Sequence, residues 1–156
     1  MKYQFQDVIY EFDNVCLATF EKCRQRTCVL RENGGQLFAK FLGDKIVIEI
    51  ATITRGNTKR SRFGFWPDRL AERQDIQALF DKGLHYIGDW HTHPESTPAP
   101  SASDRIKMID IFQRSNHELK NMLMVIVGLA SFPEGLFVGS VMDECISMLL
   151  PKYEEP

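Results

Sequence analysis

The short run Gly88-Asp89-Trp90-His91-Thr92-His93-Pro94 constrains this chain more than any other stretch. Residues i and i+2 of an extended strand point to the same side, so His91 and His93 can bind one metal ion. A His-x-His pair alone is weak evidence, but Asp104 adds a carboxylate after a loop that contains three prolines. Two imidazoles and one carboxylate suit Zn²⁺, and three protein ligands leave the fourth tetrahedral position for water. The run therefore predicts a catalytic zinc site, since a fourth Cys or His usually closes a structural one.

The spacing beyond the histidine pair makes the pattern more specific. Seven residues separate His93 from Ser101, and Asp104 follows three positions after Ser101. Upstream stands Glu32, in the sequence Glu32-Asn33-Gly34-Gly35. This arrangement resembles the JAMM signature of JAB/MPN+ zinc metalloproteases, which consists of an upstream Glu, His-Ser/Thr-His-Pro and Ser-x-x-Asp. Asn33 departs mildly from the pattern, because bacterial members carry Thr there.

The resemblance implies metal-assisted hydrolysis of an amide bond. His91, His93 and Asp104 would hold one Zn²⁺, which lowers the pKa of its bound water toward ~7. Glu32 would accept a proton from that water and later return it to the leaving amine. Ser101 would donate a hydrogen bond to the developing oxyanion.

Two of these roles have simpler alternatives. Glu32 could be a surface carboxylate beside a turn, and Glu49 and Glu95 are rival bases on composition alone. Ser101 could be a loop hydroxyl or a residue at the start of a helix. The Gly-Gly pair after Glu32 favours Glu32 as the base, because the family carries that context.

Composition favours one domain that spans residues 1–156. The net charge of −2 creates no field toward nucleic acid or membrane. The longest apolar stretch, Met122 to Ala130, is too short to span a bilayer, and no apolar export signal precedes it. The four cysteines form no Cys-x-x-Cys pair. We therefore expect a cytoplasmic protein with reduced thiols and neither a membrane nor a nucleic-acid partner.

Alternating and continuous apolar stretches predict the strands. Gly43-Asp44 suits a hairpin turn, and Gly34-Gly35 breaks the local pattern and opens the strand that runs from Gln36 to Leu42. The predicted strands cover residues 3–12, 36–42, 45–54, 84–90, 122–129 and 135–142, with a last strand or short helix over 146–150 and a frayed end over 151–156.

Three stretches show helical spacing. Asp13 or Asn14 caps the first, Pro67-Asp68 begins the second and Gly83 ends it. Ser103 is the expected cap of the third, just ahead of the predicted carboxylate ligand. The expected buried faces of the three helices are Leu17, Phe20 and Cys23; Ile76, Leu79 and Phe80; and Ile106, Ile109 and Phe112.

The order β-α-β-β-α-β-α-β-β implies a mixed α/β domain. The resemblance, which covers about residues 14–142, sharpens this to the JAB/MPN fold, related to cytidine deaminases. That fold implies a curved mixed β-sheet flanked by helices, with zinc at one edge. Trp90 alternates away from His91 along its strand, so we expect it in the core or beneath the metal site.

The segment before the second helix has two interpretations. Residues 55–62 are basic and turn-prone, and three aromatic residues follow from Phe63 to Trp66. The simpler interpretation is a solvated loop that ends in a strand with buried aromatics. The other is the rim of a substrate groove, where aromatics pack an extended peptide and Arg60 or Arg62 meets acidic partner residues.

The resemblance also implies a substrate class. JAB proteases cut after the C-terminal Gly of ubiquitin or ubiquitin-like proteins. The details around Arg60 and Gly88 resemble a bacterial (Prok-JAB) branch, whose members occur with ubiquitin-activating-like and conjugating-like enzymes and a nucleotidyltransferase in cyclic-oligonucleotide anti-phage (CBASS) operons. We therefore expect a deconjugase that binds a C-terminal tail by strand addition.

Four other functions are alternatives to this expectation, and particular sequence features bear on each. A non-catalytic MPN scaffold usually loses the ligand and base positions that are intact here. A RadC-like DNA-associated protein remains open because of the basic residues 55–62. A zinc deaminase needs His-x-Glu and Pro-Cys-x-x-Cys, and the sequence contains neither. Processing of a sulfur-carrier protein with a Gly-Gly tail shares the mechanism, and the sequence hardly separates it from deconjugation.

Overall fold

A computed structural model of the chain describes residues 1–27, 29–61 and 64–153. Helices and strands alternate along the chain as the sequence predicts for a mixed α/β domain. The elements are β1 (Lys2–Phe5), β2 (Val8–Phe12), α1 (Asn14–Cys23), β3 (Gly34–Leu42), β4 (Lys45–Ala51), β5 (Lys59–Arg60), β6 (Phe65–Trp66), α2 (Arg69–Phe80), β7 (His85–Thr92), α3 (Ala102–Arg114), β8 (Met122–Val127), β9 (Leu136–Val141), β10 (Ile146–Met148) and β11 (Leu150–Pro151).

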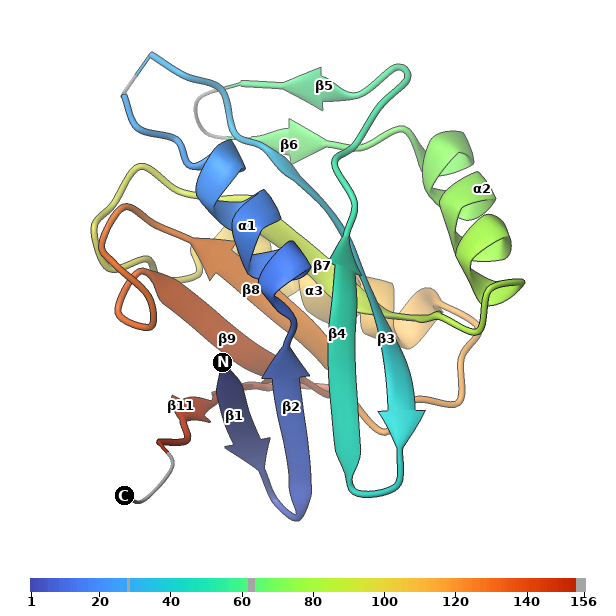
Figure 1. Cartoon of the computed structure of the whole chain (residues 1–156). Coiled ribbons are helices and arrows are strands. Elements are labelled where there is room, and N and C mark those ends of the chain that lie inside the picture. The colour runs from blue at the N-terminus through green and yellow to red at the C-terminus, as the bar shows by residue number, and fades with distance from the viewer. Residues whose placement is uncertain (28, 62–63, 154–156) are drawn as a thin grey trace.

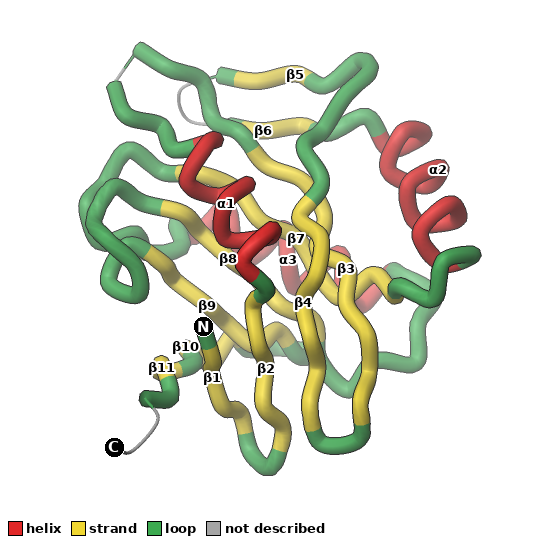
Figure 2. The backbone as a smooth tube through the Cα atoms, viewed as in Figure 1, coloured by secondary structure: helices red, strands yellow, loops and turns green. Residues whose placement is uncertain are grey.

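The main sheet has nine strands in the order β10-β9-β8-β7-β3-β4-β2-β1-β11. It is mixed, because β2 pairs with β4 and β7 pairs with β8 in parallel, whereas the other neighbours are antiparallel. The last two strands of the chain, β10 and β11, lie at opposite ends of this order, although a single residue, Leu149, joins them. The N–H of Leu149 donates to the carbonyl of Val138 at 2.8 Å. The sheet therefore curves until its two edges meet on one short segment (Figure 2), which confirms the predicted curved mixed sheet.

Helices cover both faces of this sheet. In Figure 1, α1 crosses in front of the sheet, α3 lies behind it and α2 stands beside it. Alternate residues of β8 serve the two sides: Leu123 and Val125 pack in the core under α1, and Met122 and Met124 pack in the core under α3. A strand covered on both faces must be apolar throughout, and all six residues of β8 are buried.

The glycine pair that was expected to open this strand forms its first two residues, so β3 begins at Gly34, two residues before the predicted bound at Gln36. Gly35 pairs with Trp90 across β3 and β7. A Cβ on Gly35 would lie only 1.8 Å from the carbonyl oxygen of Thr52, and that oxygen accepts the indole N–H of Trp90 at 2.9 Å. Glycine thus makes room for the carbonyl that holds Trp90, which is fully buried in the core as predicted.

Both ends of the chain differ from the prediction. The single strand expected over residues 3–12 is a hairpin of β1 and β2, which turns at Gln6 with a φ of 53°. The strand expected to reach Thr54 ends at Ala51. Pro151, expected to fray, pairs with Tyr3 in the sheet, and residues 154–156 lie outside the described residues.

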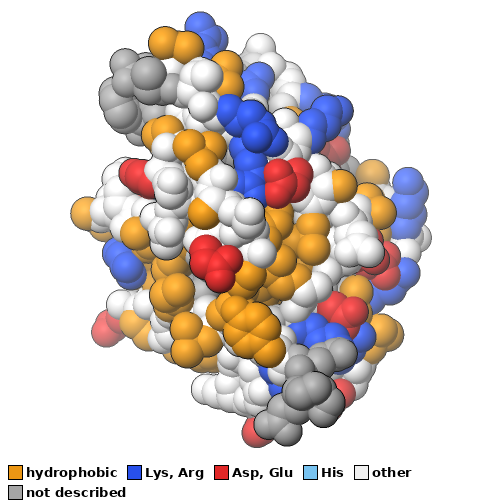
Figure 3. All heavy atoms as spheres, turned by 60° about the vertical axis from the view of Figure 1, so that its left-hand side comes forward, with side chains coloured by type: hydrophobic (Ala, Val, Ile, Leu, Met, Phe, Trp, Pro, Cys, Tyr) orange, Lys and Arg blue, Asp and Glu red, His pale blue; other side chains and the backbone are white. Residues whose placement is uncertain are grey.

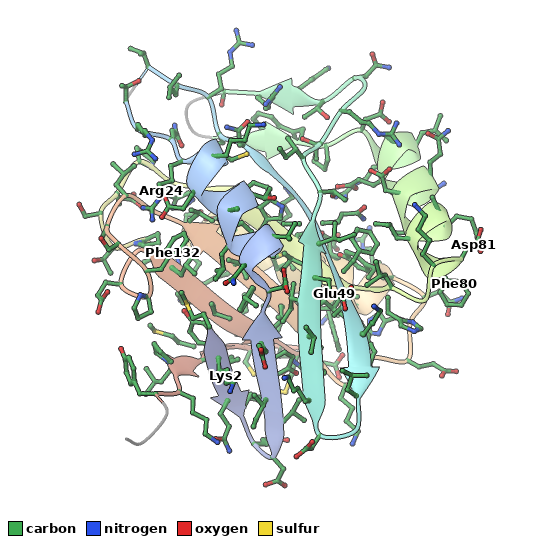
Figure 4. The ribbon with its side chains drawn as sticks, viewed as in Figure 1. Lys2, Arg24, Glu49, Phe80, Asp81 and Phe132 are labelled. Atoms are coloured by element: carbon green, nitrogen blue, oxygen red, sulfur yellow. The ribbon has the colours of Figure 1, made fainter. Side chains whose placement is uncertain are left out.

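Helix α2 is less buried than its apolar stripe predicts. Its cap is Asp68, whose carboxylate accepts the N–H groups of Leu70 and Ala71. Phe80, expected in the core, is 57% exposed, because α2 lies beside the sheet rather than across it (Figures 1 and 4). The buried residues of this helix are Ala71 and Glu72. A carboxylate therefore lies on the inner face of α2, where apolar packing was predicted.

Two further features of the structure are the length of its helices and the distribution of charge on its surface. Among the described residues, no helix is long and apolar enough to cross a membrane. On the face drawn in Figure 3, basic and acidic side chains form small separate groups with hydrophobic side chains between them. The described residues of that face form no continuous basic stripe.

Candidate metal centre

The two predicted histidine ligands lie at the carboxyl end of β7, a central strand of the sheet. His91 pairs with Gly34 of β3 on one side and with Ile126 of β8 on the other. The backbone N–H of His93 donates to the carbonyl of Val127 at 2.9 Å. These backbone bonds fix both side chains on the side opposite the buried Trp90, and their Nε2 atoms lie 3.1 Å apart.

The third predicted ligand comes from the first turn of α3. Asp104 Oδ1 lies 3.4 Å from His91 Nε2, and Asp104 Oδ2 lies 3.4 Å from His93 Nε2. The helix begins two residues earlier than predicted, because Ser101 rather than Ser103 is its N-cap. Ser101 and Asp104 form a capping box. Of the face expected to be buried, Ile106 is 71% exposed, and Met108 packs inward with Phe112.

The donor set fits zinc. Zinc–ligand bonds of about 2.0–2.1 Å in a tetrahedron place neighbouring ligand atoms about 3.3 Å apart. The Nε2 atoms of His91 and His93 lie 3.1 Å apart, close to that spacing, and each lies 3.4 Å from one of the two carboxylate oxygens of Asp104. These three side chains therefore form a group that can hold one metal ion, and three protein donors leave a position open.

Electrostatics favour the ligating protonation states of Asp104 and His91, but not that of His93. Burial opposes ionisation of Asp104, but hydrogen bonds from His91 and His93 hold its pKa well below the usual range. Burial lowers the pKa of His91. Burial also acts to lower the pKa of His93, but the hydrogen bond and charge of Asp104 outweigh it and raise that pKa. An ionised carboxylate and a neutral imidazole are ligating forms.

Glu32 shares a cavity with the three predicted ligands. The cavity has a volume of about 300 Å³, and Glu32, Ser101 and Trp66 line it with them. The side chain of Glu32 is buried, with 7% exposure. Burial raises the pKa of Glu32 to about 7, with His93 acting to lower it and Asp104 to raise it. A carboxyl that titrates near neutrality can both accept and donate a proton.

The rival bases lie elsewhere or have another partner. Glu49 projects from β4 (Figure 4) and pairs with Lys40 at 3.0 Å. Glu95 lines the cavity, but its Oε2 lies 3.1 Å from Nδ1 of His93, on the ring edge away from the predicted metal. Glu95 is thus a partner of a predicted ligand, a role that sequence reasoning missed.

Ser101 uses its hydroxyl group locally. Its Oγ donates to Asp104 Oδ2 at 2.7 Å and accepts the backbone N–H of Asp104 at 3.1 Å. A hydroxyl has a single proton. Donation from Ser101 to an oxyanion therefore requires this proton to rotate away from Asp104.

The β5–β6 hairpin forms one wall of the cavity. Gly64 and Trp66 line it, and Trp66 is 58% exposed. An exposed indole beside convergent polar groups is typical of a binding wall. Arg62 and Phe63 lie outside the described residues, and Arg60 bonds to Asn33 within the protein.

Two charged residues of the cavity were not predicted. Asp89 lies two residues before His91 on β7, and Lys107 lies three residues after Asp104 on α3. Strand and helix periodicity place each on the same side as a predicted ligand. This periodicity is a signal that could have identified them.

Comparisons with known proteins agree with this geometry. A family described as prokaryotic homologs of the JAB domain matches residues 24–137. That match includes all five predicted site residues and most of the curved sheet. The chain therefore belongs to the prokaryotic JAB-domain family.

Several curated relatives of this chain carry the name CD-NTase/cGAS isopeptidase. The protein from Vibrio cholerae is 45% identical over 70% of this chain and 69% of its own length. The protein from Pseudomonas aeruginosa is 31% identical over 77% of each chain. The protein from Enterobacter hormaechei is 29% identical over 64% of this chain, and the matched region spans 56% of that relative.

A solved structure shares the fold. The solution structure of a protein from Desulfitobacterium hafniense superposes with a TM-score of 0.64 and covers 89% of this chain and 88% of its own. Its sequence identity of 17% shows likeness of fold alone.

Proposed function

We propose that this protein is a zinc-dependent isopeptidase that hydrolyses the amide bond after the C-terminal Gly of a ubiquitin-like protein or of its conjugate. The observation that carries the proposal is the convergence of His91, His93 and Asp104, whose ligand atoms lie within 4.8 Å of one another, in one cavity with the buried Glu32. A structural metal site has no need of a titrating carboxyl beside an open position.

The proposed chemistry divides between the metal and the chain. Bound zinc would supply a Lewis acid that polarises a carbonyl and lowers the pKa of water. Glu32 takes a proton from the attacking water and delivers it to the leaving nitrogen, a task suited to its pKa of about 7. Ser101 rotates its hydroxyl from Asp104 to the developing oxyanion.

The cavity walls suit an extended tail that ends in Gly. The hairpin supplies Gly64 and Trp66 on one side, and α3 supplies Ser101 and Ser103 on the other. A tail without a side chain at its last position can bring its carbonyl to the predicted metal without steric obstruction. In this proposal Trp66 packs against the residues that precede that Gly, since indole rings bury apolar area at low entropic cost.

The names of the relatives support the biological setting. They act, by name, as isopeptidases linked to CD-NTase/cGAS enzymes. We extend this to the present chain as a cytoplasmic deconjugase of a bacterial anti-phage (CBASS) system. Its partners would be a ubiquitin-like tail, ubiquitin-activating-like and conjugating-like enzymes and a nucleotidyltransferase.

The test is cleavage of a ubiquitin-like domain fused through its terminal Gly to a reporter. The parent protein should cut after that Gly, a chelator should abolish cutting, and Glu32→Gln should keep one zinc per chain while losing turnover. Glu49→Gln is the matched control, because it removes the same charge on β4, where it pairs with Lys40, and should cut like the parent. A chain that binds no zinc and does not cut would be a scaffold, and an active Glu32→Gln would assign the base elsewhere.

A further inference from the structure

Asn33, the residue that departs from the family pattern, uses all of its polar groups. Its backbone N–H donates to Thr92 Oγ1 at 3.0 Å, and its carbonyl accepts the N–H of Thr92 at 2.9 Å. Its side-chain Nδ2 donates to the carbonyl of Cys23 at 3.1 Å, and its Oδ1 accepts from Arg60 Nη1 at 2.7 Å. The amide orientation follows from these partners, since one is a carbonyl and the other a guanidinium.

These bonds tie Glu32 to its surroundings from two directions. Thr92 is fully buried and lies between the two predicted histidine ligands, so its paired bonds with Asn33 set the distance between the Glu32 segment and the metal centre. From the other direction, the backbone N–H of Glu32 donates to the carbonyl of Ser61 at 2.9 Å. Ser61 follows Arg60 directly at the end of β5.

The hairpin therefore reaches Glu32 through two neighbouring bonds. Arg60 pairs with Phe65 of β6, the strand that carries Trp66. The strands β5 and β6 form their own sheet, separate from the nine-stranded sheet. This short ribbon gives a continuous path of backbone pairing and hydrogen bonds from Trp66 through Arg60 and Ser61 to Asn33 and Glu32.

We infer that Arg60 and Asn33 are positioning residues, which couple the substrate-facing hairpin to the location of the Glu32 carboxylate. This inference rests on the proposed function and deepens it. The amide of Asn33 offers a donor and an acceptor on two separate atoms, one for the carbonyl of Cys23 and one for Arg60. Arg60 therefore positions Glu32, the proposed base, rather than binding acidic residues of a partner.

The consequence for catalysis is a change in turnover rather than in binding. A misplacement of about 1 Å in a reacting group can cost a factor of about 100 in rate. Loss of the Arg60 bond leaves Trp66 and the predicted ligands in place but frees the Glu32 segment on one side. The rate of the chemical step should fall while the affinity for the tail stays the same.

The experiment compares Arg60→Ala and Arg60→Lys with Arg73→Ala, which removes an exposed guanidinium from α2. With the Gly-linked fusion as substrate, Arg60→Ala should lower kcat about 10- to 100-fold with KM within about twofold and zinc content unchanged. Arg60→Lys, which keeps one donor for Asn33, should recover part of the loss. Arg73→Ala should match the parent.

A second measurement needs no activity. Amide hydrogen exchange at Glu32 and Asn33 in the metal-free protein should speed up about tenfold or more in Arg60→Ala and stay unchanged in Arg73→Ala. Should the parent fail to cut the fusion, the proposed function fails, and this exchange result alone decides whether the coupling exists. Unchanged exchange, or a raised KM with an unchanged kcat, overturns the inference and returns Arg60 to substrate binding.

Discussion

The carboxylate of Glu95 lies 3.1 Å from Nδ1 of His93, on the opposite ring edge from the Nε2 atom that faces His91 and Asp104. A carboxylate at Nδ1 holds the ring proton there and leaves the Nε2 lone pair free for a metal. The backbone of Glu95 is itself anchored, because its carbonyl accepts the N–H of Leu129 at 2.9 Å.

That anchor continues into the core. Arg24 is 5% exposed and donates through Nη1 to the carbonyls of Gly128 and Ala130 at 2.8 and 2.6 Å. Its guanidinium carbon lies 4.4 Å from the ring centroid of Phe132 (Figure 4). A buried arginine thus fixes the loop against which Glu95 is held, so the orientation of His93 depends on residues far away in the sequence.

Glu95→Ala should weaken zinc binding. Partners of this kind typically contribute about 10- to 100-fold in metal affinity. We expect the lower part of that range, because the side chain of Glu95 is 59% exposed and solvent screens its charge. Competition with a chromophoric chelator measures the affinity, and Glu118→Ala, a substitution of another exposed glutamate, is the control. Equal affinities in Glu95→Ala and the parent would show that His93 needs no such partner.

Ser101→Ala should impair both folding and turnover, and a second substitution separates the two. Loss of the N-cap should cost about 1 kcal/mol in the free energy of unfolding, and loss of an oxyanion donor about 100- to 1,000-fold in kcat. Ser101→Gly keeps most of the cap stability, since Gly costs only a few tenths of a kcal/mol at this position, but it also lacks the hydroxyl. Urea unfolding and the cleavage assay should therefore find Ser101→Gly nearly as stable as the parent and as slow as Ser101→Ala. A fast Ser101→Gly would limit the serine to capping.

Local rules of strand and helix geometry were sufficient to predict that the three proposed ligands lie close together. The period of two in a strand brings His91 and His93 together, and a capping box places Asp104 beside them. The choice of Ser103 as the cap was wrong because two serines flank the helix start, and only the bonds to Asp104 distinguish Ser101.

Contacts between distant segments were beyond those rules. The Asn33–Arg60 bond spans 27 positions, and the indole bond of Trp90 to Thr52 spans 38. The hairpin at Gln6 was missed because no Gly or Asn marks its turn. Helical periodicity placed Phe80 on the predicted buried face of its helix. It could not show that α2 lies beside the sheet, where Phe80 is exposed.

Glu72 should make the protein less stable as the pH rises. Burial, then the charge of Asp89, raises the pKa of Glu72 to about 7 despite its pairing with Arg69. The folded state therefore binds this proton more tightly than the unfolded state, in which the carboxyl has its ordinary pKa of 4.5. The stabilising contribution is present below that value and is lost as the pH rises toward 7.

Glu72→Gln removes this pH dependence. Relative to the parent, it should gain on the order of 2 kcal/mol in the free energy of unfolding between pH 5 and pH 8, since each pKa unit is worth about 1.4 kcal/mol. Urea unfolding at the two pH values, with both proteins in the same metal state, measures the difference. Glu118→Gln, on the surface, should follow the parent at both values, and a Glu72→Gln that also follows it would contradict the proposed cost of burying this carboxylate.

Gly35→Ala should be among the most destabilising single substitutions, because it acts at the junction of the core and the metal centre. The added Cβ would lie 1.8 Å from the carbonyl oxygen of Thr52, a backbone atom that cannot rotate away. Separation of the strands would also break the bond that this oxygen accepts from Trp90. We expect a loss of more than about 3 kcal/mol, from overpacking and a broken buried hydrogen bond together.

Gly43→Ala is the matched control for that loss. Gly43 has a φ of 67° at the β3–β4 turn, and an added Cβ there meets nothing within 4 Å. Its substitution should cost only the backbone strain of a left-handed residue, about 1–2 kcal/mol. Urea unfolding followed by tryptophan fluorescence compares the two variants. If both variants lose the same free energy of unfolding, the close approach of Thr52 to Gly35 does not govern stability. The glycine pair after Glu32 would then matter for the candidate site and not for the core.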